Sequence, residues 1–283
     1  MTEGRCLCGA LHYQIDGPFM DLLHCHCSMC RKHHGTPFAT WAAAPLSGFR
    51  WTGDTATLAS YQSSAKGHRD FCRTCGSVAP MLDEASGLVI APAGNLEGDL
   101  GMRPTKHMFV ASKANWYPIT DELPQYDEYP PQFGMPSTPR APVALTPGVA
   151  QGSCLCGEVA YEIDGAPLRM YFCHCSRCRR GRSAAHGANV FYQAVGFRWT
   201  RGADLVEDYA FPGAQYFGTA FCRRCGSEVP RVAMERNVAS VPAGSLDSEP
   251  GIVPNGHIFV GSKAPWFDIT DDLPQFAEMP PRR

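Results

Sequence analysis

The fourteen cysteines of the chain fall into three spacings, each of which occurs twice. These spacings are a C-x-C pair, a C-x-C-x-x-C triplet and a C-x-x-C pair. In chain order the groups are Cys6 and Cys8; Cys25, Cys27 and Cys30; Cys72 and Cys75; Cys154 and Cys156; Cys173, Cys175 and Cys178; Cys222 and Cys225. Cysteines separated by one residue are poorly placed to bridge each other, and no cysteine is left over. The pattern therefore predicts metal ligation.

Seven cysteines in each set suit one closed and one open zinc site. Structural zinc takes four protein ligands in a tetrahedron, whereas reactive zinc usually has three and one exchangeable position. Each triplet can surround one ion by itself, so the two pairs of the same set must combine at a second ion. We expect about four zinc ions per chain, two for each set. The usual spacings of iron–sulfur ligands are absent, which favours zinc.

A histidine could instead close each triplet and make it a second structural site. The candidates for a fourth ligand are His24, His26, His33, His34, His174 and His186. His26 and His174 lie inside the triplets, where their rings can also point outward to hydrogen-bonding partners. For His107 and His257 we expect buried, hydrogen-bonded rings rather than a catalytic role.

Arginines lie in and just after the second triplet, at positions 177, 179, 180 and 182. They could bind the carboxylates of a peptide substrate, or they could offset the negative charge of the zinc–thiolate clusters. We favour the second interpretation.

The chain is a tandem duplication. Gly4–Gly9 recurs as Gly152–Gly157, and Phe71–Ser77 recurs as Phe221–Ser227. Prolines punctuate the stretch between the copies, which is typical of an extended linker. We expect a first zinc domain over residues 1–131, a linker over 132–149 and a second zinc domain over 150–283. Each copy is large enough to have a core of its own.

Short alternating runs of apolar and polar residues predict half-buried strands in both copies. Examples are Leu11–Ile15, Val159–Ile163 and His257–Val260. No amphipathic helix is evident beyond a helical turn after each triplet. The expected fold is all-β, with two copies of a small zinc-stapled domain of short, bent antiparallel sheets.

Composition argues against two classes of function. The formal charge of −2 becomes more negative if the cysteines are thiolates, which disfavours attraction to nucleic acid. No apolar run approaches the roughly 18 residues needed to span a bilayer, and no apolar leader opens the sequence. We expect a cytoplasmic protein that does not bind membranes. The oligomeric state is left open.

Several motifs of the two copies resemble one known family. These are Gly-x-Cys-x-Cys-Gly, Cys-His-Cys-Ser-x-Cys-Arg, Phe-Arg-Trp and Phe-Cys-x-x-Cys-Gly-Ser. They resemble the glutathione-dependent formaldehyde-activating enzymes and centromere protein V. The resemblance implies a domain of several coiled, bent antiparallel sheets. It also implies structural zinc on the combined pairs and a catalytic type of zinc on each triplet. It also implies addition of glutathione to formaldehyde, formally a carbon–sulfur lyase reaction in reverse.

Two functions therefore remain open. The first is a zinc-dependent carbon–sulfur lyase acting on a glutathione-like thiol and a formaldehyde-like aldehyde. The second is a non-catalytic zinc scaffold that binds a thiol peptide or a protein partner. We also expect the first copy to bind thiols better, because Gly35–Phe38 keeps a family-like wall after its triplet. Ser183–His186 replaces this wall in the second copy, and His186 could occupy the fourth zinc position.

Overall fold

The computed structural model describes residues 1–65, 67–134 and 145–281, and short strands dominate this part of the chain. Its two α-helices are α1 (Ser28–His34) and α2 (Ser176–Arg182). Each helix begins inside a cysteine triplet and continues past it, close to the predicted helical turn. The all-β fold with two similar halves is confirmed.

The strands of the first half are β1 (Thr2–Arg5), β2 (His12–Ile15), β3 (Asp21–Cys25), β4 (Ala39–Pro45), β5 (Phe49–Trp51), β6 (Leu58–Gln62), β7 (His68–Cys72), β8 (Met81–Asp83), β9 (Leu88–Pro92), β10 (His107–Met108) and β11 (Gln125–Tyr126). Those of the second half are β12 (Ala150–Ser153), β13 (Ala160–Ile163), β14 (Arg169–Cys173), β15 (Gly187–Tyr192), β16 (Phe197–Arg201), β17 (Val206–Ala210), β18 (Gly218–Cys222), β19 (Arg231–Ala233), β20 (Val238–Pro242), β21 (His257–Ile258) and β22 (Gln275–Phe276). Short 3-10 segments include η2 (Ala93–Asn95), η7 (Met234–Arg236), η8 (Ala243–Ser245) and η9 (Val260–Ser262).

Each half contains the same three sheets. A three-stranded sheet has the order β1-β2-β5 in the first half and β12-β13-β16 in the second. A six-stranded sheet has the order β11-β10-β3-β4-β9-β8, repeated as β22-β21-β14-β15-β20-β19. The hairpins β6-β7 and β17-β18 complete the halves. Most neighbours are antiparallel as expected, but β10 and β21 pair in parallel with both of their neighbours.

Local sequence explains the strands and their ends. β2 alternates as predicted, with Tyr13 and Ile15 buried and the residues between them partly exposed. Gly4 faces Tyr13 on the paired strand, where a Cβ atom would lie 2.2 Å from the ring, so only glycine fits. The predicted strand His257–Val260 is shorter than expected. It ends at Ile258 because Phe259 has a left-handed φ of 57° and starts η9.

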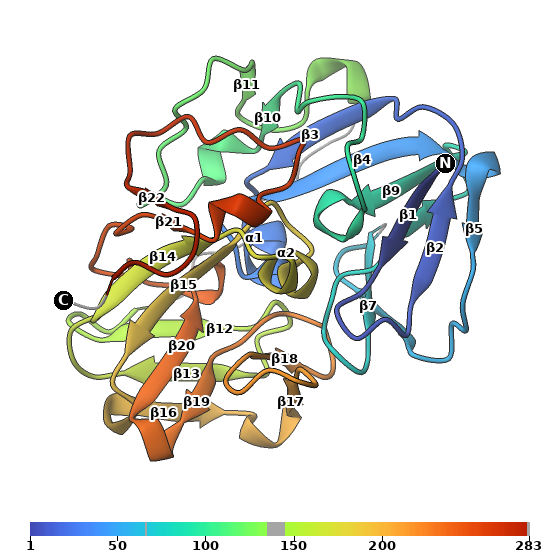
Figure 1. Ribbon diagram of the computed structural model, residues 1–283. Coiled ribbons are helices and arrows are strands. Elements are labelled where there is room, and N and C mark those ends of the chain that lie inside the picture. The colour runs from blue at the N-terminus through green and yellow to red at the C-terminus, as the bar shows by residue number, and fades with distance from the viewer. Residues whose placement is uncertain (66, 135–144, 282–283) are drawn as a thin grey trace.

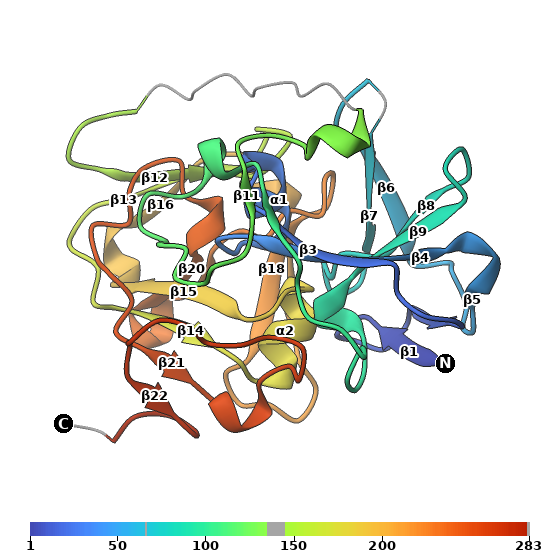
Figure 2. The same ribbon diagram turned by 90° about the horizontal axis from the view of Figure 1, so that it is seen from above.

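The two halves pack against each other through reciprocal contacts. Lys32 of α1 forms an ion pair of 2.7 Å with Asp247, and its counterpart Arg180 of α2 forms one of 2.6 Å with Glu97. In both views the helices lie at the middle of the molecule, and the three-stranded sheets lie at opposite ends (Figure 1, Figure 2). Reciprocal contacts of this kind are the mark of a two-fold symmetric interface. The halves thus pack as two subunits of a dimer would.

The aromatic pair Phe71 and Phe221 marks the same approximate symmetry. These counterparts pack with their ring centroids 6.4 Å apart. A Cβ atom on Gly76 would lie 2.6 Å from the Phe221 ring, and one on Gly226 would lie 2.4 Å from the Phe71 ring. Both glycines also have left-handed φ angles. Glycine at these two positions therefore lets the turns of both halves approach each other closely.

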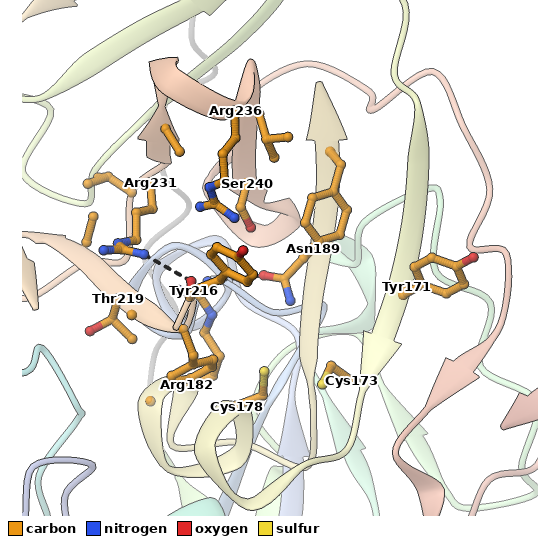
Figure 3. A pocket seen from close by; sticks show the side chains of 18 of the residues that line it. Tyr171, Cys173, Cys178, Arg182, Asn189, Tyr216, Thr219, Arg231, Arg236 and Ser240 are labelled. Carbon is orange, nitrogen blue, oxygen red and sulfur yellow. Dashed lines mark hydrogen bonds between the residues drawn. The ribbon is translucent and has the colours of Figure 1, made fainter. Parts of the chain in front are cut away.

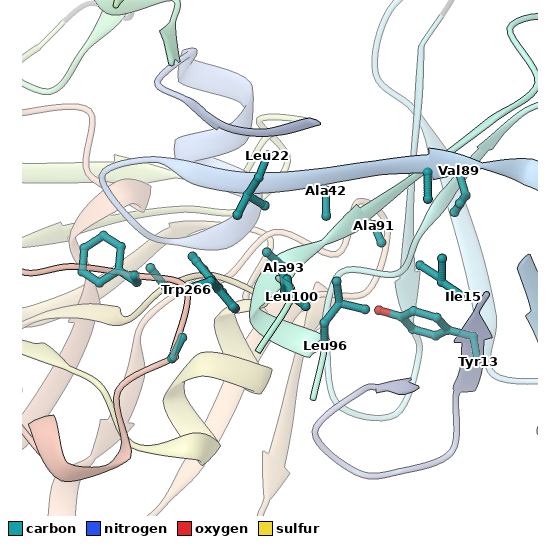
Figure 4. Packing of buried hydrophobic residues seen from close by; sticks show 14 of the residues in the cluster. Tyr13, Ile15, Leu22, Ala42, Val89, Ala91, Ala93, Leu96, Leu100 and Trp266 are labelled. Carbon is teal, nitrogen blue, oxygen red and sulfur yellow. The ribbon is translucent and has the colours of Figure 1, made fainter. Parts of the chain in front are cut away.

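The core of the first copy includes residues of the second copy. Trp266 and Phe267 of the second half are buried in one apolar cluster with Leu22, Ala42 and Ala93 of the first (Figure 4). Trp266 is fully buried. Burial of a large apolar side chain stabilises a fold by about 2–3 kcal/mol, so cross-half packing contributes to the stability of both copies. The second copy has a cluster whose buried members are all its own, whereas the core of the first copy is completed across the interface.

The proposed linker, residues 132–149, includes residues 135–144, which lie outside the described part of the chain. The boundaries of the two domains and the linker stay a prediction. Among the described residues, no helix is long and apolar enough to cross a membrane.

Candidate functional site

The two pairs of each half come together as one group of four cysteines, here called a tetrad. The first tetrad is Cys6, Cys8, Cys72 and Cys75, and the second is Cys154, Cys156, Cys222 and Cys225. Within each tetrad the sulfur atoms lie within 4.8 Å of one another. The spacing argument correctly predicted which pairs would meet.

Geometry at the tetrads fits a tetrahedral metal ion. In the first tetrad Cys8 Sγ lies 3.5 Å from Cys6 Sγ and 3.7 Å from Cys72 Sγ. The corresponding distances in the second tetrad are 3.3 Å and 3.9 Å. Tetrahedral zinc with Zn–S bonds of about 2.3 Å places its sulfur ligands about 3.8 Å apart. Each tetrad joins the turn after the first strand of its half to the end of a later strand, which is β7 in the first half and β18 in the second.

The triplets are built where a strand ends and a helix begins. Cys25 is the last residue of β3, and Cys27 caps α1 by accepting a hydrogen bond of 3.3 Å from Cys30 N. The second triplet, Cys173, Cys175 and Cys178, repeats this arrangement with the same distance. The three sulfur atoms of each triplet lie within 4.8 Å of one another, so both triplets could hold a metal ion.

The histidines inside the triplets face away from the sulfur atoms. His26 Nε2 lies 2.8 Å from His107 Nδ1, and His107 Nε2 lies 3.0 Å from Asp121. The second half repeats this His–His–Asp chain with the same distances. Burial lowers the pKa of His26 to about 3, so the ring is neutral near pH 7. These chains fix the loop that carries each triplet.

None of the other proposed fourth ligands joins a triplet. His24 bonds to Thr40 at 2.9 Å, and His34 bonds to the Arg182 carbonyl oxygen at 2.8 Å. His186 packs against Phe172, with ring centroids 4.7 Å apart. Within the described residues, the groups that could hold a metal contain cysteine alone. The proposal that His186 closes the second site was wrong, because its ring is buried between the halves.

Exposure of the cysteine residues separates the two triplets. All three cysteines of the first are buried, whereas Cys175 and Cys178 of the second are partly exposed. A pocket of about 270 Å³ opens beside the second triplet and is lined by Cys173 and Cys178 (Figure 3). Strands β14, β15, β18, β19 and β20 supply most of its other walls. A small molecule in this pocket would lie beside two of the three cysteines.

Polar and cationic side chains line the pocket. Arg231 bonds to the Asp208 carboxylate at 2.8 Å and to the Tyr216 carbonyl oxygen at 3.1 Å. Arg236 stacks over the Tyr216 ring, with its guanidinium carbon 4.4 Å from the centroid. Arg182 forms a buried ion pair with Glu228. Sequence reasoning missed Arg231 and Arg236, because they lie more than 50 residues from the triplet along the chain.

The arginines that sequence analysis noted have mostly structural partners. Arg180 pairs with Glu97 across the halves, and Arg177 lies over the Phe211 ring at 5.1 Å. Arg179 is half-buried, and burial lowers its pKa. Of these four residues, Arg182 alone lines the pocket.

Larger or apolar side chains occupy the corresponding space in the first half. Strand register makes the counterparts plain: Asn189 corresponds to Trp41, Thr219 to Arg69, Arg231 to Met81 and Ser240 to Ile90. Trp41, Met81 and Ile90 pack in one apolar cluster with the first triplet. Arg69 Nη1 lies 3.7 Å from Cys30 Sγ. The first triplet is therefore embedded in side chains of its own half.

Comparison with known proteins identifies the family of the chain. The family model described as glutathione-dependent formaldehyde-activating enzyme (GFA) matches residues 1–112 and 149–262, one match for each half. The chain belongs to the GFA family. Both matched segments contain a complete tetrad and a complete triplet.

Individual relatives cover parts of this GFA chain. A Halomonas elongata protein named "Putative glutathione-dependent formaldehyde-activating enzyme" is 29% identical over 133 residues, which are 42% of this chain and 81% of that protein. An uncharacterized lyase of Schizosaccharomyces pombe is 31% identical over 80 residues, or 26% of this chain and about half (53%) of the lyase. A crystal structure of a Rhodobacter sphaeroides protein shares 30% identity, covers 34% of this chain and 89% of that chain, and has a TM-score of 0.29.

Gly35–Phe38, the GFA-like wall that we expected beside the first triplet, contacts the second half instead. A Cβ atom on Gly244 of the second half would lie 2.4 Å from Thr36 N, and the Phe38 ring packs 5.7 Å from the His186 ring. Thr36 and Phe38 are thus both buried between the halves. The premise that these residues form the wall of a thiol site was therefore wrong, whereas the expectation about which copy binds thiols better stays a prediction.

Proposed function

We propose that this GFA protein is a carbon–sulfur lyase type of enzyme that acts on the adduct of a glutathione-like thiol and a formaldehyde-like aldehyde, and that its working site is the second triplet. The observation that carries the proposal is the pocket that reaches Cys173 and Cys178. Family membership and the names of the relatives give the reaction class. The first triplet is buried and would not meet the substrate.

The donor sets support zinc at all four cysteine groups, about four ions per chain. The tetrads offer four sulfur atoms at spacings that suit a closed tetrahedral site. The second triplet offers three sulfur atoms beside a pocket. When bound there, a zinc ion would hold an incoming thiol as its thiolate.

The pocket residues favour a thiol substrate that carries carboxylate groups. Arg231 and Arg236 present guanidinium groups at the wall formed by β19 and η7. Arginine binds carboxylates through paired, charge-assisted hydrogen bonds. A thiol peptide with its sulfur at the triplet could place a carboxylate against these groups. Glutathione carries two carboxylates and one thiol, so it suits a pocket that combines cysteines with arginines.

The chain would also contribute to the reaction by excluding bulk water and by orienting the reactants. Besides Cys173 and Cys178, the lining of the pocket includes the apolar side chains of Phe191, Val229 and Ile258. Apolar walls strengthen the electrostatic interactions made by a bound thiolate. Because the thiol adds to formaldehyde readily without a catalyst, we expect the enzyme to act mainly by holding both reactants in one geometry.

Exchange of ¹³C-labelled formaldehyde between its hydrate and its glutathione adduct, measured by NMR, tests this function. Zinc-loaded protein should accelerate the exchange. Cys175→Ser should abolish the acceleration, and Cys27→Ser, the matched change in the buried triplet, should keep it. A wild-type protein that binds zinc and glutathione but does not accelerate exchange would instead be the non-catalytic zinc scaffold.

A further inference from the structure

One polar side chain in the pocket has an orientation that its neighbours dictate. Arg182 Nη2 donates a hydrogen bond of 3.1 Å to Asn189 Oδ1. A guanidinium has donors and no acceptors, so the atom of Asn189 that faces it must be the amide oxygen. The Nδ2 group must then point the other way. It makes no hydrogen bond with another described residue, and Figure 3 shows it turned toward Cys173 and Cys178.

A buried ion pair holds this orientation. Arg182 is largely buried and pairs with Glu228, of which only 1% is exposed. Burial lowers the pKa of Arg182 to about 10, which still leaves the side chain cationic at neutral pH. Breaking such a pair leaves an uncompensated buried charge, so the guanidinium has little freedom to move. The chain Glu228–Arg182–Asn189 therefore fixes the amide in one orientation.

Space for a small reactant lies between the amide and the triplet. Gly187, on the same strand as Asn189, has no side chain, and a Cβ atom there would lie 3.2 Å from Asn189 Nδ2 and 3.6 Å from Cys178 Sγ. The amide nitrogen and the sulfur thus border the same small volume. In the first half Ala39 takes the position of Gly187. Val78, His34 and Trp41 take the positions of Glu228, Arg182 and Asn189. The whole arrangement exists only beside the exposed triplet.

We propose that Asn189 Nδ2 donates a hydrogen bond to the aldehyde oxygen during carbon–sulfur bond formation and cleavage, and that Arg182 and Glu228 are its positioning residues. This inference rests on the proposed function. In the forward direction the thiolate sulfur attacks the carbonyl carbon, the carbon–sulfur bond forms and the π electron pair moves to oxygen, which then takes a proton from solvent. In reverse, the hydroxyl group loses its proton to solvent and the carbon–sulfur bond breaks. Negative charge develops on oxygen in both directions, where a fixed amide donor stabilises it.

Two substitutions of nearly equal size test the donor. Asn189→Asp keeps the acceptor for Arg182 but removes the N–H groups, and Asn189→Leu removes them without adding charge. Removal of one such donor typically costs on the order of 10²-fold in turnover. Both variants should therefore lose about 10²-fold in formaldehyde exchange at saturating glutathione, while calorimetry finds glutathione affinity changed by less than about threefold. Trp41→Phe, at the matched position of the first half, should change neither quantity.

Arg182→Lys tests the positioning role, since lysine can keep the ion pair with Glu228 but lacks the planar fork that also reaches Asn189. It should lower turnover without lowering glutathione affinity. Added to Asn189→Asp, it should cause little further loss, because both changes disable the same donor. Wild-type turnover in both Asn189 variants, or equal losses of turnover and glutathione affinity, would overturn the inference alone. Absence of turnover in the wild-type protein would overturn the proposed function and this inference together.

Discussion

The two triplets of this chain have the same backbone setting and opposite surroundings. Each runs from the last residue of a strand to the first turn of a helix, with the same cap and the same His–His–Asp support. The first is buried beneath Trp41, Met81 and Ile90, and the second opens on a pocket. Duplication thus preserved the ligands in both copies, whereas the side chains around them diverged. Cysteine spacing identifies where metal can bind, but the walls decide which site a substrate can reach.

The largest expected effect is the difference in stability between a substitution in a tetrad and one in a triplet. Cys222→Ser removes a ligand from a closed site that joins the β12–β13 turn to the end of β18. Structural zinc contributes on the order of 10 kcal/mol to folding, which is comparable to the whole stability of a domain. The variant should unfold or become insoluble, whereas Cys175→Ser should stay folded. Soluble yield and thermal melting followed by circular dichroism measure this. Equal damage by both substitutions would make the second triplet structural as well.

A reciprocal exchange of wall residues should break the asymmetry between the triplets. Asn189→Trp places the first-half side chain in the pocket and should weaken glutathione binding by more than tenfold. Trp41→Asn removes a large buried ring, and removal of a buried Trp side chain typically costs about 3–5 kcal/mol of stability. Denaturant titration and calorimetry measure the two effects. If Asn189→Trp bound glutathione as well as the wild type, the pocket would not be the thiol site.

Arg231→Met converts another pocket position to its first-half counterpart. Loss of a hydrogen bond to a charged group costs about 1.5–3 kcal/mol, so glutathione affinity should fall roughly tenfold or more. Binding of 2-mercaptoethanol, which has no carboxylate, should be unchanged. Met81→Leu is the matched control in the first half and should leave both affinities as they are. A parallel loss for both thiols would mean that Arg231 maintains the pocket rather than binding a carboxylate.

The smallest effect concerns acid stability. Burial lowers the pKa of His186 to about 3, well below the value of about 6.5 expected in the unfolded chain. The unfolded state therefore binds more protons below pH 6.5, and stability falls as the pH drops from there toward pH 3. His186→Phe, which copies Phe38, should remove about 1 kcal/mol of this loss at pH 5.5. Denaturant melts at pH 7.5 and 5.5 measure it, and an unchanged pH dependence would contradict the assignment.

Much of the fold was predictable because it follows from local chemistry. The pairing of Cys6 and Cys8 with Cys72 and Cys75 followed from ligand counting, and the duplication followed from repeated motifs. The shared core was not predictable, because the role of Trp266 depends on how the halves pack. The pocket was missed because Arg231 joins its lining only through the register of β19 and β20.

Glutathione titration by calorimetry into Cys27→Ser and Cys175→Ser, each checked for retained fold and zinc, tests most directly whether the second triplet is the working site. The Cys27→Ser protein keeps the exposed triplet and should bind one glutathione with the affinity of the wild type. The Cys175→Ser protein keeps only the buried triplet and should show no binding. Wild-type affinity in Cys175→Ser, together with loss of binding in Cys27→Ser, would contradict the account.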